Sequence, residues 1–115
     1  MISHNTPIKV VFYSSDSGCE PVRDWLKGLI RENCRLIGED IKTLQFGWPV
    51  SMPLARKMDN KLWELRTKLP FGIARIFFTI YDSKIVLLHG YIKKSQKTPV
   101  NELATAKRRL KKLRT

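Results

Sequence analysis

Cysteine, histidine and acidic residues are all scarce in this chain of 115 residues. The two cysteines, Cys19 and Cys34, are too few for a disulfide scaffold and are not spaced like metal ligands. The two histidines, His4 and His89, lie far apart in the sequence, so we expect neither a bound metal nor a cofactor. Asp and Glu total 10 against 22 Lys and Arg, which gives a formal net charge of +12.

Long apolar runs are absent as well. No run approaches the roughly 18 residues of a transmembrane helix, so we expect no membrane association. The opening segment MISHNTPIKVVFYSS has no charged start, long apolar stretch or cleavage site, so we expect no secretory signal and a cytoplasmic location. Hydrophobic residues make up 43% of the chain, which excludes wholesale disorder. Without repeats or linkers, residues 1–115 are predicted to form one domain.

The positive charge is concentrated towards the C-terminal end. Residues 1–83 carry 12 basic and 9 acidic side chains, whereas residues 84–115 carry 10 basic ones and a single acid, Glu102. This distribution favours a polyanionic partner, because phosphate groups attract Lys and Arg. A solvated surface is the alternative interpretation, although charges of mixed sign would serve solubility equally well.

The hydrophobic pattern predicts an α+β fold with the element order β-α-α-β-β-β-α. Strands are expected at residues 8–13, 62–68, 73–80 and 84–94, and short turns between the last three indicate an antiparallel sheet. One helix opens at Glu20-Pro21 and a second covers residues 34–46; together they are expected to form an antiparallel hairpin that packs on the sheet. A basic helix follows Thr98-Pro99, and residues 47–60 are expected to be a loop.

Side chains alternate between the two faces of a strand, and this alternation sorts the ionisable residues. Each of the last three strands has one apolar row, which should pack on the helix hairpin. In the last strand this row is Val86, Leu88, Gly90 and Ile92. The opposite rows, predicted to share one open face, contain Glu64, Arg66, Arg75, His89, Tyr91 and Lys93.

These residue types suit metal-free RNA cleavage. The reaction needs a base for the ribose 2′-hydroxyl, cations around the phosphate and a proton donor for the leaving 5′-oxygen. His89 and Glu64 are candidate bases, and Arg66 and Arg75 can hold a phosphate through two hydrogen bonds. Lys93 and Lys94 add positive charge, and Tyr91 can stack on a base or donate a proton. The alternatives are a Glu64–Arg66 ion pair, a half-buried His89, a packed Tyr91 and a solvated turn at residues 93–97.

Several segments resemble the RelE/ParE superfamily of small toxins from bacterial type II toxin–antitoxin modules, and most closely its phage-derived, HigB-like branch. The matching segments are PVRDWL at 21–26, LWELR at 62–66, RIFF at 75–78, LLHGYIKKSQKTP at 87–99 and ELATAK at 102–107. The likeness covers nearly the whole chain in the same element order. It implies that residues 1–115 form a single RelE/HigB-like toxin domain with a RelE-like fold.

The resemblance also implies an activity and partners. Such toxins are mRNA interferases: endoribonucleases that cut mRNA on the ribosome and inhibit translation. A helix-turn-helix antitoxin neutralises them in a hetero-oligomer, and they reach operator DNA only through that complex. By position, Arg75 matches an arginine at the phosphate, Arg66 a basic residue on the preceding strand, and Lys93 and Lys94 the basic pair after the last strand.

Catalysis is therefore assigned to six residues and RNA binding to five. The catalytic set is Glu64, Arg66, Arg75, His89, Lys93 and Lys94. The RNA-binding set is Tyr91, Lys97, Lys107, Arg108 and Lys111. Two alternatives stay open: a ParE-like inhibitor of DNA gyrase with the same fold, and a nucleic-acid-binding module without catalytic activity.

Overall fold

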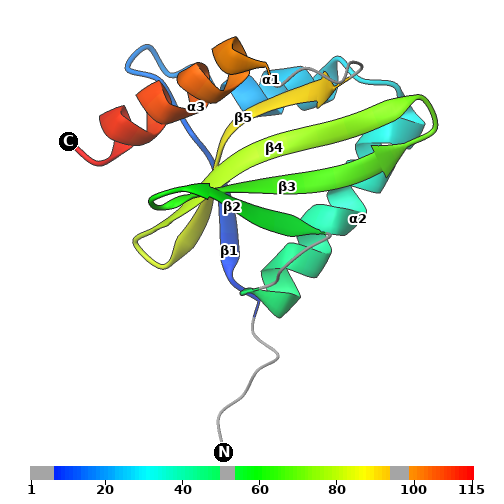
Figure 1. Cartoon of the computed structure of the whole chain (residues 1–115), viewed down its shortest axis with the longest axis horizontal. Coiled ribbons are helices and arrows are strands. Elements are labelled where there is room, and N and C mark those ends of the chain that lie inside the picture. The colour runs from blue at the N-terminus through cyan, green and yellow to red at the C-terminus, as the bar shows by residue number, and fades with distance from the viewer. Residues whose placement is uncertain (1–6, 50–53, 94–98) are drawn as a thin grey trace, which may run out of the picture.

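Five strands form one sheet that carries helices on both faces (Figure 1). The computed structural model describes residues 7–49, 54–93 and 99–115. Its elements are β1 (Lys9–Phe12), α1 (Pro21–Lys27), α2 (Arg31–Gly47), β2 (Ala55–Asp59), β3 (Leu62–Leu69), β4 (Gly72–Tyr81), β5 (Lys84–Lys93) and α3 (Val100–Leu113). The strand order is β1-β5-β4-β3-β2, in which β1 is parallel to β5 and the other neighbours are antiparallel. The α+β class is confirmed. None of the helices in these ranges is long and apolar enough to cross a membrane.

The structure contains a strand, β2, that is missing from the predicted element order. It lies within residues 47–60, which were expected to be a loop, and it pairs with β3 through Arg56 and Glu64. The two prolines of this segment, Pro49 and Pro53, both precede β2 and therefore take no part in its hydrogen-bond ladder. The loop prediction was wrong because a proline restricts only itself and the residue before it, and not the residues that form β2.

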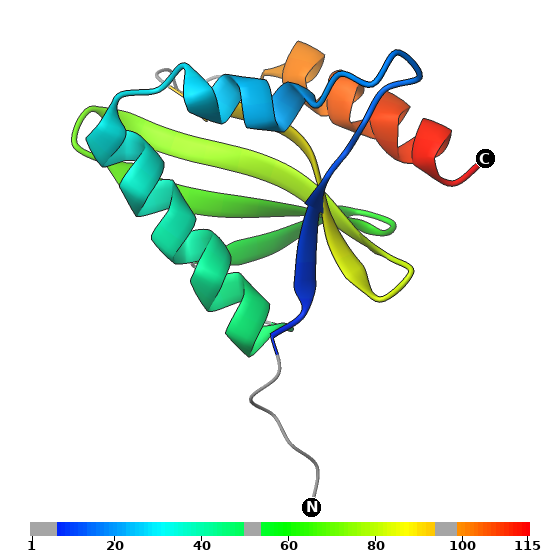
Figure 2. The same cartoon turned by 180° about the vertical axis from the view of Figure 1, so that it is seen from behind.

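The two N-terminal helices cover one face of the sheet but do not form the predicted antiparallel hairpin. In Figure 2 they diverge from the short turn between them. Helix α1 packs mainly on β5 and β1, whereas α2 packs on β3. Helix α1 ends at Lys27, before Gly28, so Ile30 falls in the turn and its side chain is exposed. The pattern of apolar residues places a helix on the core but does not determine the angle between two helices.

The hydrophobic core consists of two clusters, one on each face of the sheet. The first lies beneath α1 and α2 and includes Val22, Ile37, Leu44, Leu65, Ile76 and Phe78. The second lies beneath α3 and includes Leu62, Phe77, Val86, Leu88 and Ala106. Leu103, Leu110 and Leu113 of α3 pack against the second cluster, because their spacing places them on one face of the helix. Helix α3 therefore covers the sheet face that was expected to be open.

A β-bulge in β5 changes which side chains face α3. Phe77 of β4 pairs with His89, but its neighbour Phe78 pairs with Leu87, so Leu88 is an additional residue in β5. Val86 and Leu88 were expected to share a face with Ile92, but they belong to the cluster beneath α3, whereas Ile92 packs on the other face. Simple alternation fails here because it assumes an uninterrupted ladder.

Gly90 allows the Trp25 ring of α1 to lie directly against β5. A Cβ atom at position 90 would come within 2.5 Å of the Trp25 ring, whereas one at Gly38 on α2 would meet no atom within 4 Å.

We predict that Gly90→Ala lowers the free energy of unfolding by about 1–3 kcal/mol, because the packed ring must shift. Gly38→Ala should raise it by about 0.5–1 kcal/mol, because alanine favours a helix. Urea denaturation measures both, and equal stability of the two variants would contradict the prediction.

Candidate functional site

The strand register brings most of the predicted site residues together. Across β3, β4 and β5, Arg66 pairs with Arg75, which pairs with Tyr91. In the row two residues away on one side, Glu64 of β3 pairs with Phe77 of β4, and Phe77 pairs with His89 of β5. In the row on the other side, Lys68 of β3 pairs with Ile73 of β4, and Ile73 pairs with Lys93 of β5. We call Arg56, Glu64, Arg75, Tyr91 and Lys93 the Glu64 cluster, because these five residues line one small cavity.

A buried ion pair lies at the centre of the Glu64 cluster. Arg75 Nη1 donates to Glu64 Oε1 over 2.8 Å, and the two residues are only 6% and 1% exposed. Arg56 Nη2 lies 3.6 Å from the same oxygen, with its side chain largely exposed. Both contacts fall on Oε1, so Glu64 Oε2 has no hydrogen bond to a residue of the described ranges. The cluster therefore contains a buried carboxylate whose second oxygen is not engaged by a described residue.

The cavity at the Glu64 cluster is small. Its volume is about 30 Å³, and Pro99 and Leu103, at the start of α3, form its apolar cover. That volume holds a water molecule or two but not a phosphodiester. The predicted face thus gathers the right groups, but α3 covers them.

Tyr91 is the phenol of the Glu64 cluster. Its ring is buried and stacks on Phe77 and His89, with centroids 5.9 and 6.1 Å away. Burial raises the pKa of the Tyr91 phenol, and the Glu64 carboxylate raises it further, against the opposing effect of Arg75. The phenol is therefore protonated at neutral pH.

His89 is held by two residues of α3. Arg109 Nη1 lies 3.2 Å from His89 Nδ1 and also donates to the carbonyl oxygen of Leu88 over 2.8 Å. Arginine can only donate, so Nδ1 accepts and the ring proton is on Nε2, which bonds Glu102 Oε1 over 2.5 Å. Both ring nitrogens of His89 are thus occupied, so His89 is not a free base in this conformation.

The remaining candidates for catalysis differ in how well they are placed. Arg66 and Lys93 are half-buried, and neither forms an ion pair with another residue in the described ranges. The alternative Glu64–Arg66 ion pair is not formed, because Glu64 bonds Arg75 instead. Lys94 and Lys97 lie outside the described residues.

The basic residues of α3 differ in the contacts that they make. Lys107 bonds Asp59 over 3.1 Å and Lys112 bonds Asp16 over 2.6 Å. Arg114 donates to the Ile80 carbonyl oxygen over 2.6 Å. Arg108 and Lys111 are exposed, on turns of α3 beyond the Glu64 cluster. Arg114 therefore joins the end of α3 to β4, whereas Lys107 and Lys112 form exposed ion pairs that add little stability. Arg108 and Lys111 are the best placed to meet an external phosphate.

Sequence reasoning missed three residues of the site. Arg56 was overlooked because its strand was assigned to a loop. Glu102 and Arg109 were overlooked because contacts across α3 do not follow from strand alternation.

The Glu64–Arg75 pair should matter strongly for stability. We predict that Arg75→Met lowers the free energy of unfolding by about 3–5 kcal/mol, because it leaves the buried carboxylate without its main partner. The double variant Glu64→Leu/Arg75→Met should recover most of this loss. Arg23→Met, which breaks an exposed ion pair with Glu20, serves as the control and should change stability by less than about 1 kcal/mol. Denaturant unfolding tests this, and a double variant as unstable as Arg75→Met would contradict it.

The Tyr91 phenol should ionise at a higher pH than an ordinary tyrosine. Because the pKa of Tyr91 is raised in the folded state, the protonated phenol stabilises the fold at pH values below the ordinary tyrosine pKa of about 10. This contribution is lost as the pH rises through the folded-state pKa. We predict that the absorbance difference at 295 nm between the natural chain and Tyr91→Phe has its midpoint above pH 10. We also predict that the natural chain loses stability relative to Tyr91→Phe above that pH. A midpoint at or below 10 would contradict both expectations.

Comparison with known proteins identifies the family. A search of curated proteins finds no match. The family model described as phage derived protein Gp49-like (DUF891) matches residues 24–111, which include β2 to β5 and the whole Glu64 cluster. This match covers well over half of the sequence, and the chain therefore belongs to the phage-derived Gp49-like family.

Proposed function

We propose that the chain is the toxin of a type II toxin–antitoxin module and acts as a metal-free endoribonuclease, an mRNA interferase that cuts mRNA on the ribosome. The observation that carries the proposal is the Glu64 cluster, where a carboxylate, a protonated phenol and three cations surround one cavity. Membership of the Gp49-like family and the likeness to HigB-like toxins support the same assignment. The exposed Arg108 and Lys111 supply positive charge for the RNA backbone.

Each step of RNA cleavage has a candidate group in the cluster. Glu64 takes the proton from the ribose 2′-hydroxyl, and the resulting oxygen attacks the adjacent phosphorus to form a cyclic phosphate. Arg75, Arg66 and Lys93 stabilise the negative charge on the phosphate oxygens. Tyr91 gives its proton to the 5′-oxygen as the bond to phosphorus breaks. In this scheme His89 orients Tyr91 through the stacked rings.

The covered cavity gives the proposal a structural requirement. A phosphodiester does not fit beneath Pro99 and Leu103, so the start of α3 must move when RNA binds. The His89–Glu102 contact is the polar link between this part of α3 and β5, and its loss on RNA binding would release both residues. RNA therefore competes with α3 for the cluster.

The proposed partners follow from the same assignment. A cognate helix-turn-helix antitoxin neutralises the toxin in a hetero-oligomer, and operator DNA is reached only through that complex. The net charge of +12 suits an antitoxin segment that is acidic.

Lys93 offers the sharpest test of the proposed activity, because it lies at the cavity without an ion pair to another described residue. We predict that the chain cleaves mRNA on programmed ribosomes and that Lys93→Ala lowers the rate about 10²-fold, because one phosphate cation is lost. Lys42→Ala, on the exposed side of α2, is the matched control and should cleave at the natural rate. Mapping of the 5′ ends of the products measures the rate, and thermal melts check that both variants are folded.

Three outcomes would overturn the proposal. Cleavage by Lys93→Ala at the natural rate would remove the Glu64 cluster from catalysis. Ribosome-bound mRNA that stays intact, together with inhibition of DNA supercoiling by gyrase, would favour the ParE-like alternative. Binding of RNA without fragments would favour a module that has no catalytic activity.

A further inference from the structure

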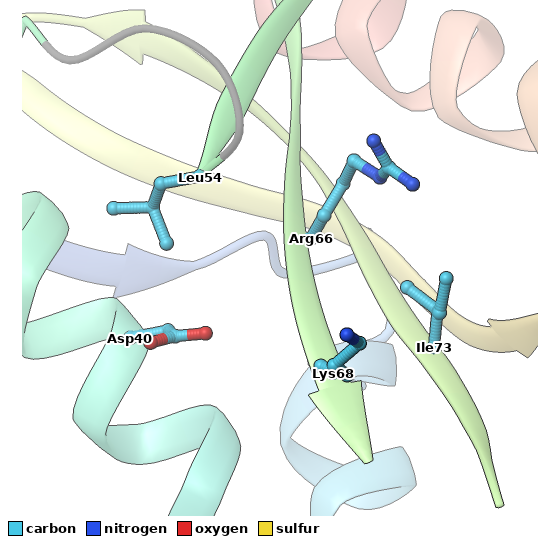
Figure 3. Close-up of a pocket in the computed structure, with 5 residues that line it drawn as sticks. All are labelled: Asp40, Leu54, Arg66, Lys68 and Ile73. Atoms are coloured by element: carbon cyan, nitrogen blue, oxygen red, sulfur yellow. The ribbon is translucent and has the colours of Figure 1, made fainter.

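A larger cavity lies next to the Glu64 cluster, at the end of β3. Its volume is about 450 Å³, within the range of small-molecule binding sites. Its lining residues come from four segments of the chain: Asp40 of α2, Leu54 before β2, Arg66 and Lys68 of β3, and Ile73 of β4 (Figure 3).

The charges around this cavity are not neutralised by one another. Asp40, Arg66 and Lys68 form no ion pair within the described part of the chain. The buried Nε of Arg66 has no hydrogen-bond partner there either. Figure 3 shows the Asp40 carboxylate directed from α2 towards β3. Leu54 and Ile73 add apolar side chains to the lining, Leu54 on the same side of β3 as Asp40 and Ile73 beside Arg66 and Lys68 (Figure 3). Such a lining fits a ligand with a flat apolar body, hydrogen-bond donors for the carboxylate and an anionic group for the cations.

Arg66 joins this cavity to the Glu64 cluster. It lines the cavity and is also the direct cross-strand neighbour of Arg75. In Figure 3 its guanidinium extends away from Asp40, towards the side of the sheet that α3 covers. Ile73, on the cavity wall, is likewise the neighbour of Lys93. A phosphate held by Arg66, Arg75 and Lys93 would therefore place an attached nucleoside beside the cavity.

We propose that this cavity is a nucleobase pocket that binds guanine next to the phosphate to be cleaved. That the ligand is part of an RNA chain rests on the proposed function. That the pocket prefers guanine to the other bases can be tested without it. Guanine presents two neighbouring donors, N1–H and the N2 amino group, and a carboxylate can accept both. Adenine and cytosine present a single amino group beside an acceptor, and uracil presents one N–H between two carbonyl oxygens. Asp40 therefore selects guanine, while Leu54 and Ile73 contact the ring.

Binding of mononucleotides tests the pocket without any cleavage. Titrations of GMP, AMP, CMP and UMP would be followed by NMR chemical shifts in the natural chain, Asp40→Asn and Asp24→Asn. Asp24 is an exposed carboxylate on α1 that does not line the cavity, so its variant is the matched control. We expect shifts at Leu54 and Ile73 and a GMP affinity about tenfold higher than that of UMP. Asp40→Asn should abolish this preference, and Asp24→Asn should keep it.

The cleavage products provide a second arm. The natural chain should leave guanosine beside the cut more often than the other nucleosides, and Asp40→Asn should cut with little preference. Equal affinity for the four mononucleotides, or an unchanged preference in Asp40→Asn, would overturn the guanine pocket even if RNA is cleaved. Binding of GMP with the expected selectivity by a chain that cleaves no RNA would uphold the pocket and overturn the proposed function.

Discussion

The ion pair between Glu64 and Arg75 is the constraint on which the rest of the site depends. A carboxylate that is 1% exposed is stable only with a partner, and β4 supplies that partner from the next strand. The pair links β3 to β4 at the centre of the sheet. The ion pair offsets much of the cost of burying the two charges beneath α3, although Arg75 Nε has no hydrogen-bond partner among the described residues. The same pair presents a carboxylate oxygen and an arginine to whatever enters the cavity.

Much of the fold could be predicted from local patterns, and the errors arose where distant residues decide the outcome. The rows Trp63–Leu65 and Ala74–Ile76–Phe78 face the helices as alternation predicted, because β3 and β4 pair without a bulge. Alternation failed in β5, where Leu88 interrupts the ladder. The path of α2 away from α1 depends on which strand each helix packs against, and this cannot be determined from the periodicity of either helix.

The candidate site was predictable in composition but not in accessibility. Strand alternation placed Glu64, Arg75 and Tyr91 on one face, and the register brings them together. Their burial depends on where α3 crosses the sheet, and there Ala106 packs into the second cluster while Lys107 forms an exposed ion pair with Asp59. These contacts join residues far apart in the sequence, so the apolar stripe of α3 predicts that the helix packs but not what it covers.

The parallel pairing of β1 with β5 has a consequence for how the sheet is assembled. Lys9 pairs with Lys84, so this contact closes a loop of most of the chain, whereas β3, β4 and β5 are joined by tight turns. The entropy cost of closing a loop rises with its length, and contacts between distant residues slow folding. The three-stranded meander is therefore expected to form first, with β1 adding to its edge afterwards. Until then the edge of β5 has unpaired backbone groups, and at this stage the chain is most prone to pair with a strand from another molecule.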